Sequence, residues 1–395
     1  QDMLFSYDCR NCSQCIGCVG LRNKQYHIFN KPHTKEDYQE FLKNLDTGSY
    51  RTVEELKKKY LEFAATFPRK YMYSLKTVDV TGDILLEAKN CMSCFDAVNL
   101  EDCKYIVWGG FGMKDSMDGY GVGEQSELLY ESVDAGLSGS RMLGAIVVYG
   151  GHDIRYAYNC HSSNNIFGCT GLRSKSYCIL NRQYSKKDYE ALLPKIIRHM
   201  NDVPYTDKKG REYRYGEFFP TELCPFSYNE TIAQEYFPMT KEKAMEEGYA
   251  WKDADARNLT ITMQSDALPD SITDATDDLL KQVIGCAHNG ECNEQCTVGF
   301  RVVPQELAFY REERLPPPRL CPNCRHYQRV KQRNPLRLWH RQCTCAGGAD
   351  ESGVYKNTIE HFHGAKHCPN EFETTYAPDR PEIVYCETCY NAEIA

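Results

Sequence analysis

The chain has 395 residues, with 47 lysines and arginines against 55 aspartates and glutamates, so its formal net charge is −8. This length predicts two or three domains, and the charge excludes a globally basic nucleic-acid coat protein. Its apolar runs fall short of the roughly 18 residues that a transmembrane helix needs, and no signal peptide opens it. We therefore expect a cytoplasmic protein without a membrane partner.

Cysteine is the dominant feature of the composition. There are 21 cysteines, and an odd number argues against a closed disulfide framework. In a chain without a leader, cysteine pairs spaced Cys-x-x-Cys favour metal thiolates and buried thiols over disulfides.

The first cysteines form a run spaced by three: Cys9, Cys12, Cys15 and Cys18. Ferredoxin-type clusters use similar spacing, but their last gap is one residue longer and a proline follows. We favour core packing for these four thiols, because cysteine also serves as a small buried hydrophobe. Zinc and iron–sulfur binding are the alternatives.

A long repeat relates two distant parts of the chain. Cys18–Leu42 and Cys169–Leu193 are offset by 151 residues and share about half of their residues. Each copy is an extended cysteine-rich stretch followed by a helix, for which Thr34 and Ser185 are good N-caps. We predict a first repeat copy in a coil over 1–33, a helical insertion over 34–76, and a helix with an ordered connector over 185–270.

A shorter period appears between the two copies. Four aspartates recur at a constant interval, each 19 positions after the one before: Asp96, Asp115, Asp134 and Asp153. Short apolar runs rich in β-branched residues separate turn signals here, as in buried strands. We predict a mainly β fold with α insertions, in which residues 77–184 form a parallel β-helix (solenoid) with coils of about 19 residues. An ordinary β-sandwich is the alternative.

The C-terminal part, 271–395, is predicted to be a tandem zinc-ribbon domain with two structural Zn²⁺ ions. The first site combines two thiolate pairs, Cys292 with Cys296 and Cys321 with Cys324, as tetrahedral structural zinc requires. Cys286 and His288 lie close by and could each replace one ligand.

The second predicted zinc site is less regular. Cys386 and Cys389 form one clear pair, and we favour Cys345 and Cys368 as the other two ligands. Cys343 is also a candidate, and three histidines lie nearby: His361, His363 and His367. Sites made of four cysteine ligands have no open coordination position, so both sites are predicted to be structural and not catalytic.

A basic strip lies between the two sites, with aromatic residues interleaved. Arginine with aromatic side chains is typical of nucleic-acid surfaces, although acidic residues in 253–278 could neutralise the strip instead. The candidate nucleic-acid contacts are Arg319, Arg325, Arg329, Lys331, Arg333, Arg337, Trp339 and Arg341.

These motifs together resemble a family of cysteine-rich repeat proteins with C-terminal zinc ribbons, known mostly from small-genome bacteria of the candidate phyla. The likeness spans nearly the whole chain. Its main blocks are Gly20–Lys31, Gly171–Tyr184, Glu217–Pro225, Tyr228–Pro238, Phe300–Tyr310, Cys321–Trp339 and Cys368–Tyr390. The resemblance implies treble-clef-like or ribbon zinc modules, with 346–367 as an insertion, and it implies no activity.

We therefore predict a non-enzymatic, zinc-stabilised scaffold that presents its β-solenoid surface to a protein or nucleic-acid partner. One alternative is an RNA- or DNA-binding protein that uses the basic strip, 311–341. A weaker alternative is a carbohydrate-active enzyme that uses Asp115, Asp118 or Asp134. Uncapped solenoid ends would also allow a homo-oligomer.

Overall fold

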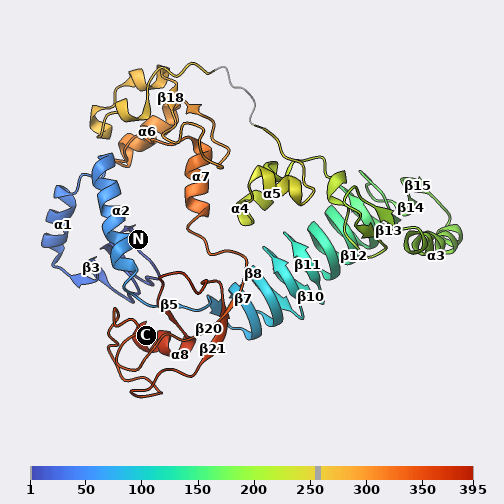
Figure 1. The fold of residues 1–395 in the computed structure, drawn as a ribbon, viewed down its shortest axis with the longest axis horizontal. Coiled ribbons are helices and arrows are strands. Elements are labelled where there is room, and N and C mark those ends of the chain that lie inside the picture. Colours follow the sequence, from blue (N-terminus) through green and yellow to red (C-terminus); the bar gives the residue numbers. More distant parts are fainter. Residues whose placement is uncertain (1, 254–258, 395) are drawn as a thin grey trace.

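The computed structural model describes residues 2–253 and 259–394 of the chain. It is mixed α/β, with about a third of the chain in strands and eight α-helices in the described part. A long stack of strands extends from a group of smaller units in which both termini lie (Figure 1). The prediction of a mainly β chain thus underestimated the helical share.

A short stack of strands, residues 3–32, opens the chain and is followed by two helices. The strands of this stack are β1 (Met3–Leu4), β2 (Ser13–Ile16), β3 (Gln25–Ile28) and β4 (Lys31–Pro32). The two helices that follow are α1 (Lys35–Asn44) and α2 (Tyr50–Ala64). The first three strands pair in parallel with partners 12 positions apart, such as Met3 with Cys15. β4 then turns back and pairs antiparallel with β3.

The main stack, residues 74–183, follows the short strand β5 (Arg69–Lys70). Its strands are β6 (Ser74–Leu75), β7 (Val78–Leu86), β8 (Lys89–Glu101), β9 (Lys104–Val107), β10 (Gly110–Lys114), β11 (Met117–Tyr120), β12 (Glu127–Tyr158), β13 (His161–Phe167), β14 (Ser176–Ile179) and β15 (Arg182–Gln183). All pair in parallel except β15. Five of them, β8, β9, β11, β12 and β10, close into a ring of parallel strands.

The coil length predicted from the aspartates is wrong. Paired residues in the main stack lie 12 or 13 positions apart from Gly82 onward, as in Tyr149 with His161 and Met117 with Tyr130, and 11 apart before it, as in Val78 with Lys89. We call this stretch one layer. Two layers of 13 residues and one layer of 12 residues together have the length of two predicted coils of 19 residues. Neighbouring aspartates of the series are therefore one and a half layers apart. The pairing therefore aligns Asp96 with Asp134, through Trp108 and Gly121, while the aspartates between them lie elsewhere on each layer.

A three-residue backbone rhythm builds each layer. Every third side chain is buried in the stack, as at Leu129, Ser132 and Ala135. The residue before each of these has a positive φ: 59° at Leu128, 50° at Glu131 and 50° at Asp134. Left-handed backbone costs roughly 1–2 kcal/mol for a non-glycine residue, so interstrand hydrogen bonds and core packing must offset it repeatedly.

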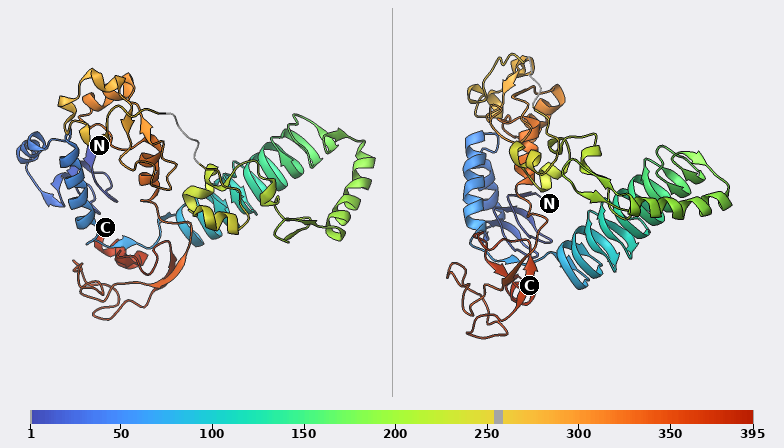
Figure 2. Two further views of the ribbon diagram at one scale, coloured as in Figure 1. Left: turned by 45° about the horizontal axis from the view of Figure 1, so that its top comes forward. Right: turned by 45° about the vertical axis from the view of Figure 1, so that its right-hand side comes forward.

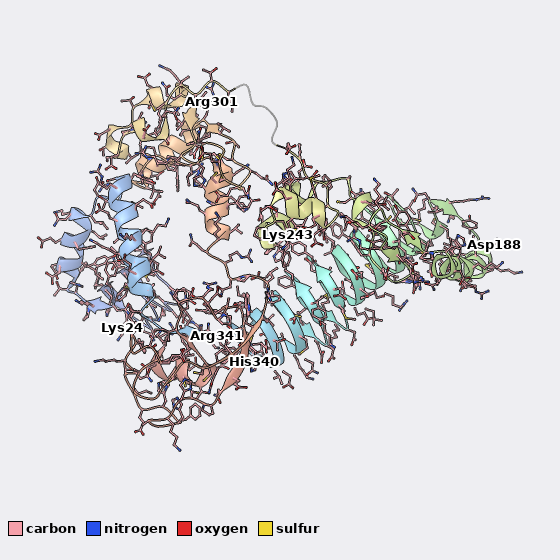
Figure 3. The ribbon with its side chains drawn as sticks, in the orientation of Figure 1. Lys24, Asp188, Lys243, Arg301, His340 and Arg341 are labelled. Atoms are coloured by element: carbon pink, nitrogen blue, oxygen red, sulfur yellow. The ribbon has the colours of Figure 1, made fainter. Side chains whose placement is uncertain are left out.

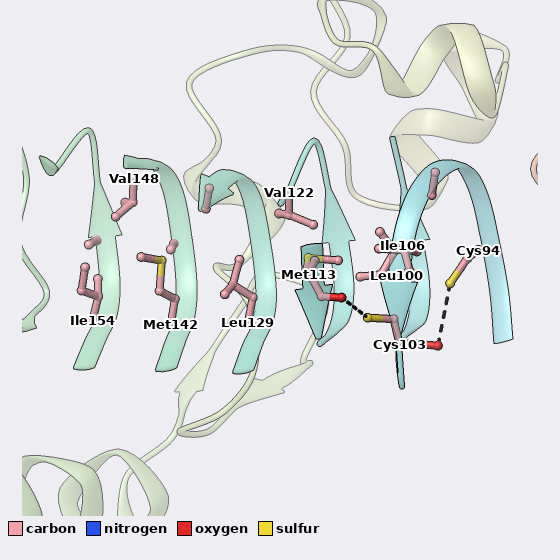
Figure 4. Close-up of a cluster of buried hydrophobic side chains, with 14 of the residues drawn as sticks. Cys94, Leu100, Cys103, Ile106, Met113, Val122, Leu129, Met142, Val148 and Ile154 are labelled. Carbon is pink, nitrogen blue, oxygen red and sulfur yellow. Dashed lines mark hydrogen bonds between the residues drawn. The ribbon is translucent and has the colours of Figure 1, made fainter. Parts of the chain in front are cut away.

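The same rhythm explains the cysteines outside the C-terminal region. Ten of them donate their S–H to the carbonyl two residues earlier, as Cys15 does to Ser13. Some thiols also lie near a carbonyl of the next layer (Figure 4), as Cys94 does near Cys103. Cysteine suits a narrow core because it is small and carries a weak donor. Serines in the same register, such as Ser163, make the same contact.

Glycine is required in the longer layers, which span 13 positions. Gly110, Gly123 and Gly136 stack one above another, with φ between 134° and 152°. A Cβ on Gly123 would overlap the Gly110 carbonyl oxygen. These positions therefore accept no side chain.

Both stacks end in the same way, as the long repeat predicts. β3, β4 and α1 correspond to β14, β15 and α3 (Lys186–Asp202), with Thr34 and Ser185 as N-caps. Asn30 bonds the N–H and C=O of Val19, and Asn181 does the same for Thr170. These side chains satisfy backbone groups that the last layer would leave unpaired. The far end of the main stack is therefore covered by α3.

The remaining elements form the connector and two C-terminal modules (Figure 2). In the connector they are β16 (Tyr205–Thr206), β17 (Glu212–Tyr213), η1 (Thr221–Leu223), η2 (Tyr228–Glu230), α4 (Ala233–Tyr236) and α5 (Lys241–Glu246). After it come η3 (Ser265–Ala267), η4 (Ile272–Asp274), η5 (Asp277–Lys281), β18 (Ile284–Gly285), β19 (Gly299–Phe300), α6 (Pro304–Glu312) and α7 (Pro322–Val330). The last elements are β20 (Trp339–Gln342), β21 (Glu371–Thr374), β22 (Val384–Tyr385) and α8 (Glu387–Ile394).

The C-terminal part joins the two stacks. β22 pairs in parallel with β5, between α2 and the main stack. Thr375 donates to Asp83 of the main stack, and Tyr390 donates to Asp8 of the first stack. The last segment of the chain, 339–394, therefore contacts both stacks and holds them together.

Candidate functional site

Two C-terminal modules bring ten cysteines together. Module A spans 284–330 and module B spans 339–394. In each, a Cys-x-x-Cys pair lies at the start of a helix: Cys321 is the N-cap of α7, and Cys386 directly precedes α8. Free N–H groups and the helix dipole stabilise thiolates at such a position.

Module A gathers a group of four cysteines that could hold a metal ion: Cys286, Cys296, Cys321 and Cys324. Three of the predicted ligands are present, and Cys286 takes the place expected for Cys292. The antiparallel pair β18–β19 causes this exchange, because Cys286 directly follows β18 and its N–H bonds Val298 beside Cys296. Cys292 belongs to a neighbouring group with His288, Glu294 and Cys324.

Module B gathers a second group of four buried cysteines: Cys343, Cys368, Cys386 and Cys389. Cys343 takes the place expected for Cys345. The N–H of Cys386 bonds the Cys343 sulfur at 3.2 Å, which matches the bond from Cys321 to Cys286 in module A. Cys345 lies instead with His361, His363 and Cys389. The sequence signals for these corrections were the pairs Cys286-x-His288 and Cys343-x-Cys345, which lie upstream of the Cys-x-x-Cys pair in each module.

The electrostatics of these groups favour anionic sulfur at selected positions. A hydrogen bond from Cys343 lowers the pKa of Cys386 well below its usual range, although burial opposes the shift. Burial opposes ionisation of Cys321 too, but bonds from Thr297 and Cys324 lower its pKa to about 6. Burial raises the pKa of Cys286 to about 11. A cation would overcome this last penalty, since metals bind the deprotonated thiol.

The four N-terminal cysteines are arranged differently. Their sulfurs bond backbone carbonyls, as described above, and Cys15 and Cys18 are fully buried. Burial raises the pKa of Cys18 to about 12, so its thiol is neutral at pH 7. In the described part of the chain, no group of potential metal ligands includes these four residues.

Most of the predicted basic strip is engaged within the molecule. Lys331 pairs with the buried Glu294, Arg325 with Glu306 at 3.2 Å, and Arg333 with Asp96 of the main stack. These ion pairs tie α7 and the chain after it to their surroundings. These three acidic partners lie outside 253–278, the segment whose acidic residues were expected to neutralise the strip.

The other strip residues divide between packing and solvent. Arg319 lies over the Tyr50 ring and donates to the Pro269 carbonyl, while Arg341 donates to Tyr376 and Ala377. Figure 3 shows Arg341 and His340 close to the first layers of the main stack. The remaining three are Arg337, which stacks on the Trp339 ring at 5.1 Å, Trp339 itself, and the exposed Arg329.

The main stack carries a hollow of about 460 Å³ that the sequence did not predict. We name it the aromatic hollow. Trp108 and Phe111, each 66% exposed, line it with Leu137, Glu124 and Asp134. Gly121 packs beside the indole, where a Cβ would lie 3.6 Å from the Trp108 ring, an ordinary contact distance. Only the observed layer pairing brings Trp108 and Phe111 next to Glu124 and Asp134.

The hollow lies on a strongly acidic part of the stack. Residues 79–134 contain 12 aspartates and glutamates against 3 lysines, a formal net charge of −9 that exceeds the charge of the whole chain. Within the hollow, Asp134 accepts a hydrogen bond from the Tyr149 hydroxyl at 2.7 Å, which holds its carboxylate at the rim.

The three carboxylates named for a carbohydrate enzyme lie apart. Asp134 lines the aromatic hollow, whereas Asp118 lies with Glu131 in a second hollow of about 380 Å³. Burial raises the pKa of both Asp118 and Glu131, and the charge of Asp118 adds to the shift at Glu131. Asp115 lines neither of these two hollows.

Comparisons with protein-family models, curated proteins and solved structures found no match for this chain. Among the described helices, none has the length and apolar character needed to cross a bilayer. The geometry of the modules and of the aromatic hollow is therefore the basis for a functional proposal.

Proposed function

We propose that this chain is an interaction protein in which zinc-bound modules hold a β-solenoid, the main stack, that binds a cationic polypeptide segment. The observation that carries the proposal is the aromatic hollow on the acidic part of the stack. Exposed Trp108 and Phe111 offer ring faces for lysine and arginine, and Glu124 and Asp134 offer charge.

The solenoid interpretation rests on the parallel pairing and on the inward side chain at every third residue. Zinc is proposed because four cysteines in a buried group match its preferred tetrahedral thiolate site. Neighbouring sulfurs at 3.7–3.9 Å agree with the separation of about 3.8 Å that Zn–S bonds of 2.3 Å give in a tetrahedron.

The position of the charges favours a polypeptide over a nucleic acid. A strand of RNA or DNA would meet the −9 charge of residues 79–134, and Arg325 and Arg333 of the basic strip are already in ion pairs. A cationic segment would gain from the same field, both in approach and in binding.

The test is binding of the zinc-loaded full chain to immobilised random peptides graded by net charge. We expect binding to increase with positive charge and to weaken at high salt. Trp108→Ala should reduce the affinity for the best peptide by about tenfold or more, since exposed aromatics dominate such contacts. Phe226→Ala is the matched control, because Phe226 is 59% exposed and lies in the connector, outside both hollows.

Equal binding by Trp108→Ala and the unchanged chain would contradict the proposal. So would tight binding of labelled single-stranded RNA that disappears in Arg329→Glu/Arg337→Glu. That result would favour the basic strip as a nucleic-acid surface.

The second hollow supports one further candidate, a carbohydrate-active enzyme. Asp118 and Glu131 lie on adjacent layers beside Tyr105 and Phe237, and glycoside hydrolysis needs two carboxyl groups of which one stays protonated. Release of reducing sugar from a panel of polysaccharides, lost in Glu131→Gln, would support it. An inactive chain with the peptide behaviour above would leave only the interaction protein.

A further inference from the structure

Each C-terminal module contains a second ligand group next to its cysteine group, and the two groups share one cysteine. In module A the second group contains His288, Cys292, Glu294 and Cys324; in module B it contains Cys345, His361, His363 and Cys389. We propose that each module binds two zinc ions bridged by a thiolate, that of Cys324 in module A and that of Cys389 in module B. This inference rests on the proposed zinc binding but not on the proposed partner.

Distances around the shared sulfurs fit a bridge. The Cys324 sulfur lies 3.8 Å from that of Cys286, in the first group, and 3.7 Å from that of Cys292, in the second. The Cys389 sulfur lies 3.7 Å from that of Cys368 and 3.3 Å from Nε2 of His363. Each bridging sulfur is thus within one tetrahedral edge of ligands from both groups.

In module B the histidines are oriented as metal ligands. Nδ1 of His361 faces the Cys345 sulfur at 3.1 Å, while its Nε2 lies 2.8 Å from Glu393. The side chains of His361 and Glu393 are 1% and 0% exposed. Nε2 of His363 faces Cys389, and its Nδ1 lies 2.6 Å from the Lys366 carbonyl oxygen. A carboxylate or carbonyl on the other ring nitrogen is the usual support for a metal-bound imidazole.

Module A contains unsatisfied polar atoms at the corresponding place. Oε2 of Glu294 and Nδ1 of His288 are buried and lack a hydrogen-bond partner in the described structure, although they lie 3.1 Å apart. Leaving such atoms unpaired costs roughly 1–3 kcal/mol each. A cation bound by both atoms and by Cys292 and Cys324 would satisfy them. Lys331 neutralises the other oxygen of Glu294.

The charges of the full sets also balance better with two ions. Module B offers five thiolates and two neutral imidazoles, so two Zn²⁺ ions leave a net charge of −1. Module A offers five thiolates, one imidazole and Glu294, which gives −2, and Lys331 reduces this to −1. With a single ion in the first group, the fifth thiol keeps its proton and each module is left with a net charge of −2 in a buried site, which is costly.

The two modules therefore build the same pair of adjacent ligand groups from different parts of the chain. Module A takes its second group from the loop between β18 and β19, and module B takes two histidines from 346–367. The segment that the family resemblance marks as an insertion thus carries ligands. It need not be a passive loop.

The experiment measures zinc per chain in the full-length protein by mass spectrometry of the metal. We expect four zinc ions in the unchanged chain, three in His361→Ala/His363→Ala, and four in the control His340→Ala, whose histidine is exposed on β20. Two ions per chain would overturn this inference and leave one zinc per module standing. No zinc would overturn both.

Cobalt substitution tests the bridge itself and does not depend on a destabilised variant. Paramagnetic resonance of Co²⁺ added in steps should weaken as the second ion of each module binds, because a shared thiolate couples the two spins. Signals that grow in proportion to cobalt up to saturation would overturn the bridge. A milder variant is Glu393→Gln, which should lower the affinity of module B for its second ion by about 10–100-fold, as measured by competition with a chelator. An unchanged affinity would contradict the role of His361.

Discussion

The main stack and the C-terminal modules use cysteines at the same spacing for different ends. Cys91 and Cys94 in the stack are three residues apart, as are Cys321 and Cys324 in module A. In the stack, each thiol donates to the carbonyl two residues before it. In the module, the sulfurs face one another and the N–H groups around a helix start.

The difference lies in the backbone that precedes each cysteine. In the stack, a left-handed residue comes before each inward cysteine, as at Asn90 and Ser93, and the thiol meets a carbonyl acceptor. In the modules, the first cysteine of each pair lies at the start of a helix and its sulfur accepts N–H donors: Cys321 accepts from the Thr297 backbone and Cys386 from the Asn370 amide. Acceptors and burial keep most stack thiols protonated, whereas donors and dipoles stabilise a thiolate that can bind a metal. Cys91 differs from its neighbours, because hydrogen bonds from Cys103 and Cys94 lower its pKa.

Removing the metal should separate the two regions most strongly. Structural zinc contributes about 10–16 kcal/mol to small zinc domains, and modules A and B have small cores of their own. We expect a strong chelator to expose 284–394 to limited proteolysis while fragments covering 74–183 persist. Mass spectrometry of the fragments checks this, with chelator already saturated by zinc as the control. Equal loss of both regions would contradict a stack held by its own packing.

Gly123→Ala should damage the stack and spare the metals. Its Cβ would overlap the Gly110 carbonyl oxygen in a backbone with φ of 152°. We expect a loss of roughly 2–4 kcal/mol in the unfolding free energy of the stack, measured by urea titration with hydrogen exchange of β12. Gly348→Ala is the control, because open space surrounds a Cβ there. Unchanged β12 protection would contradict the close stacking of the longer layers.

The sequence predicted which helices and strands form better than it predicted how the strands stack on one another. The long repeat correctly aligned β3, β4 and α1 with β14, β15 and α3, since it depended on matching residues and caps. The layer length was missed because a left-handed position shows no fixed residue type: Leu128, Glu131 and Asp134 serve equally. Glycines spaced by 13, at 110, 123 and 136, were the signal that remained in the sequence.

The metal groups show the same limit. Spacing identified the pairs at α7 and α8, because a short loop fixes their geometry locally. It could not choose between Cys286 and Cys292, or between Cys343 and Cys345, because hairpin pairing distant from the helix decides which sulfur enters each group. The aromatic hollow was missed for a related reason, since its residues meet only through the layer register.

A single thiol in the stack should be replaceable without loss of metal. Cys160 is fully buried, and its sulfur lies 3.5 Å from the Tyr158 and Cys169 carbonyl oxygens. Serine keeps a donor there, as Ser163 does naturally, so we expect Cys160→Ser to cost about 1 kcal/mol in thermal unfolding and to leave zinc content unchanged. Cys386→Ser is the contrasting variant and should lose metal. Zinc loss from Cys160→Ser would contradict the division between the two cysteine classes.

The smallest effect concerns charge on the stack surface. Asp153 accepts two bonds of 2.8 Å from Arg141, and these hold the pKa of its carboxyl well below the usual range. Because an unfolded aspartate titrates near pH 3.9, the stabilisation is complete above that pH and is lost as the pH falls through the lower folded value.

Arg141 is half exposed, so solvent limits the effect of Asp153→Asn to about 1 kcal/mol or less. Hydrogen exchange of β12 in the full chain, compared between pH 7 and pH 3, should show the variant less protected at pH 7 and a smaller difference between the two chains at pH 3. Asp134→Asn, whose carboxylate accepts from the Tyr149 hydroxyl, controls for the loss of one surface charge. A difference that grows as the pH falls would contradict the ion pair. Because protonation of thiolates releases a bound metal, acid should weaken the proposed zinc modules by far more than this pair contributes to the stack.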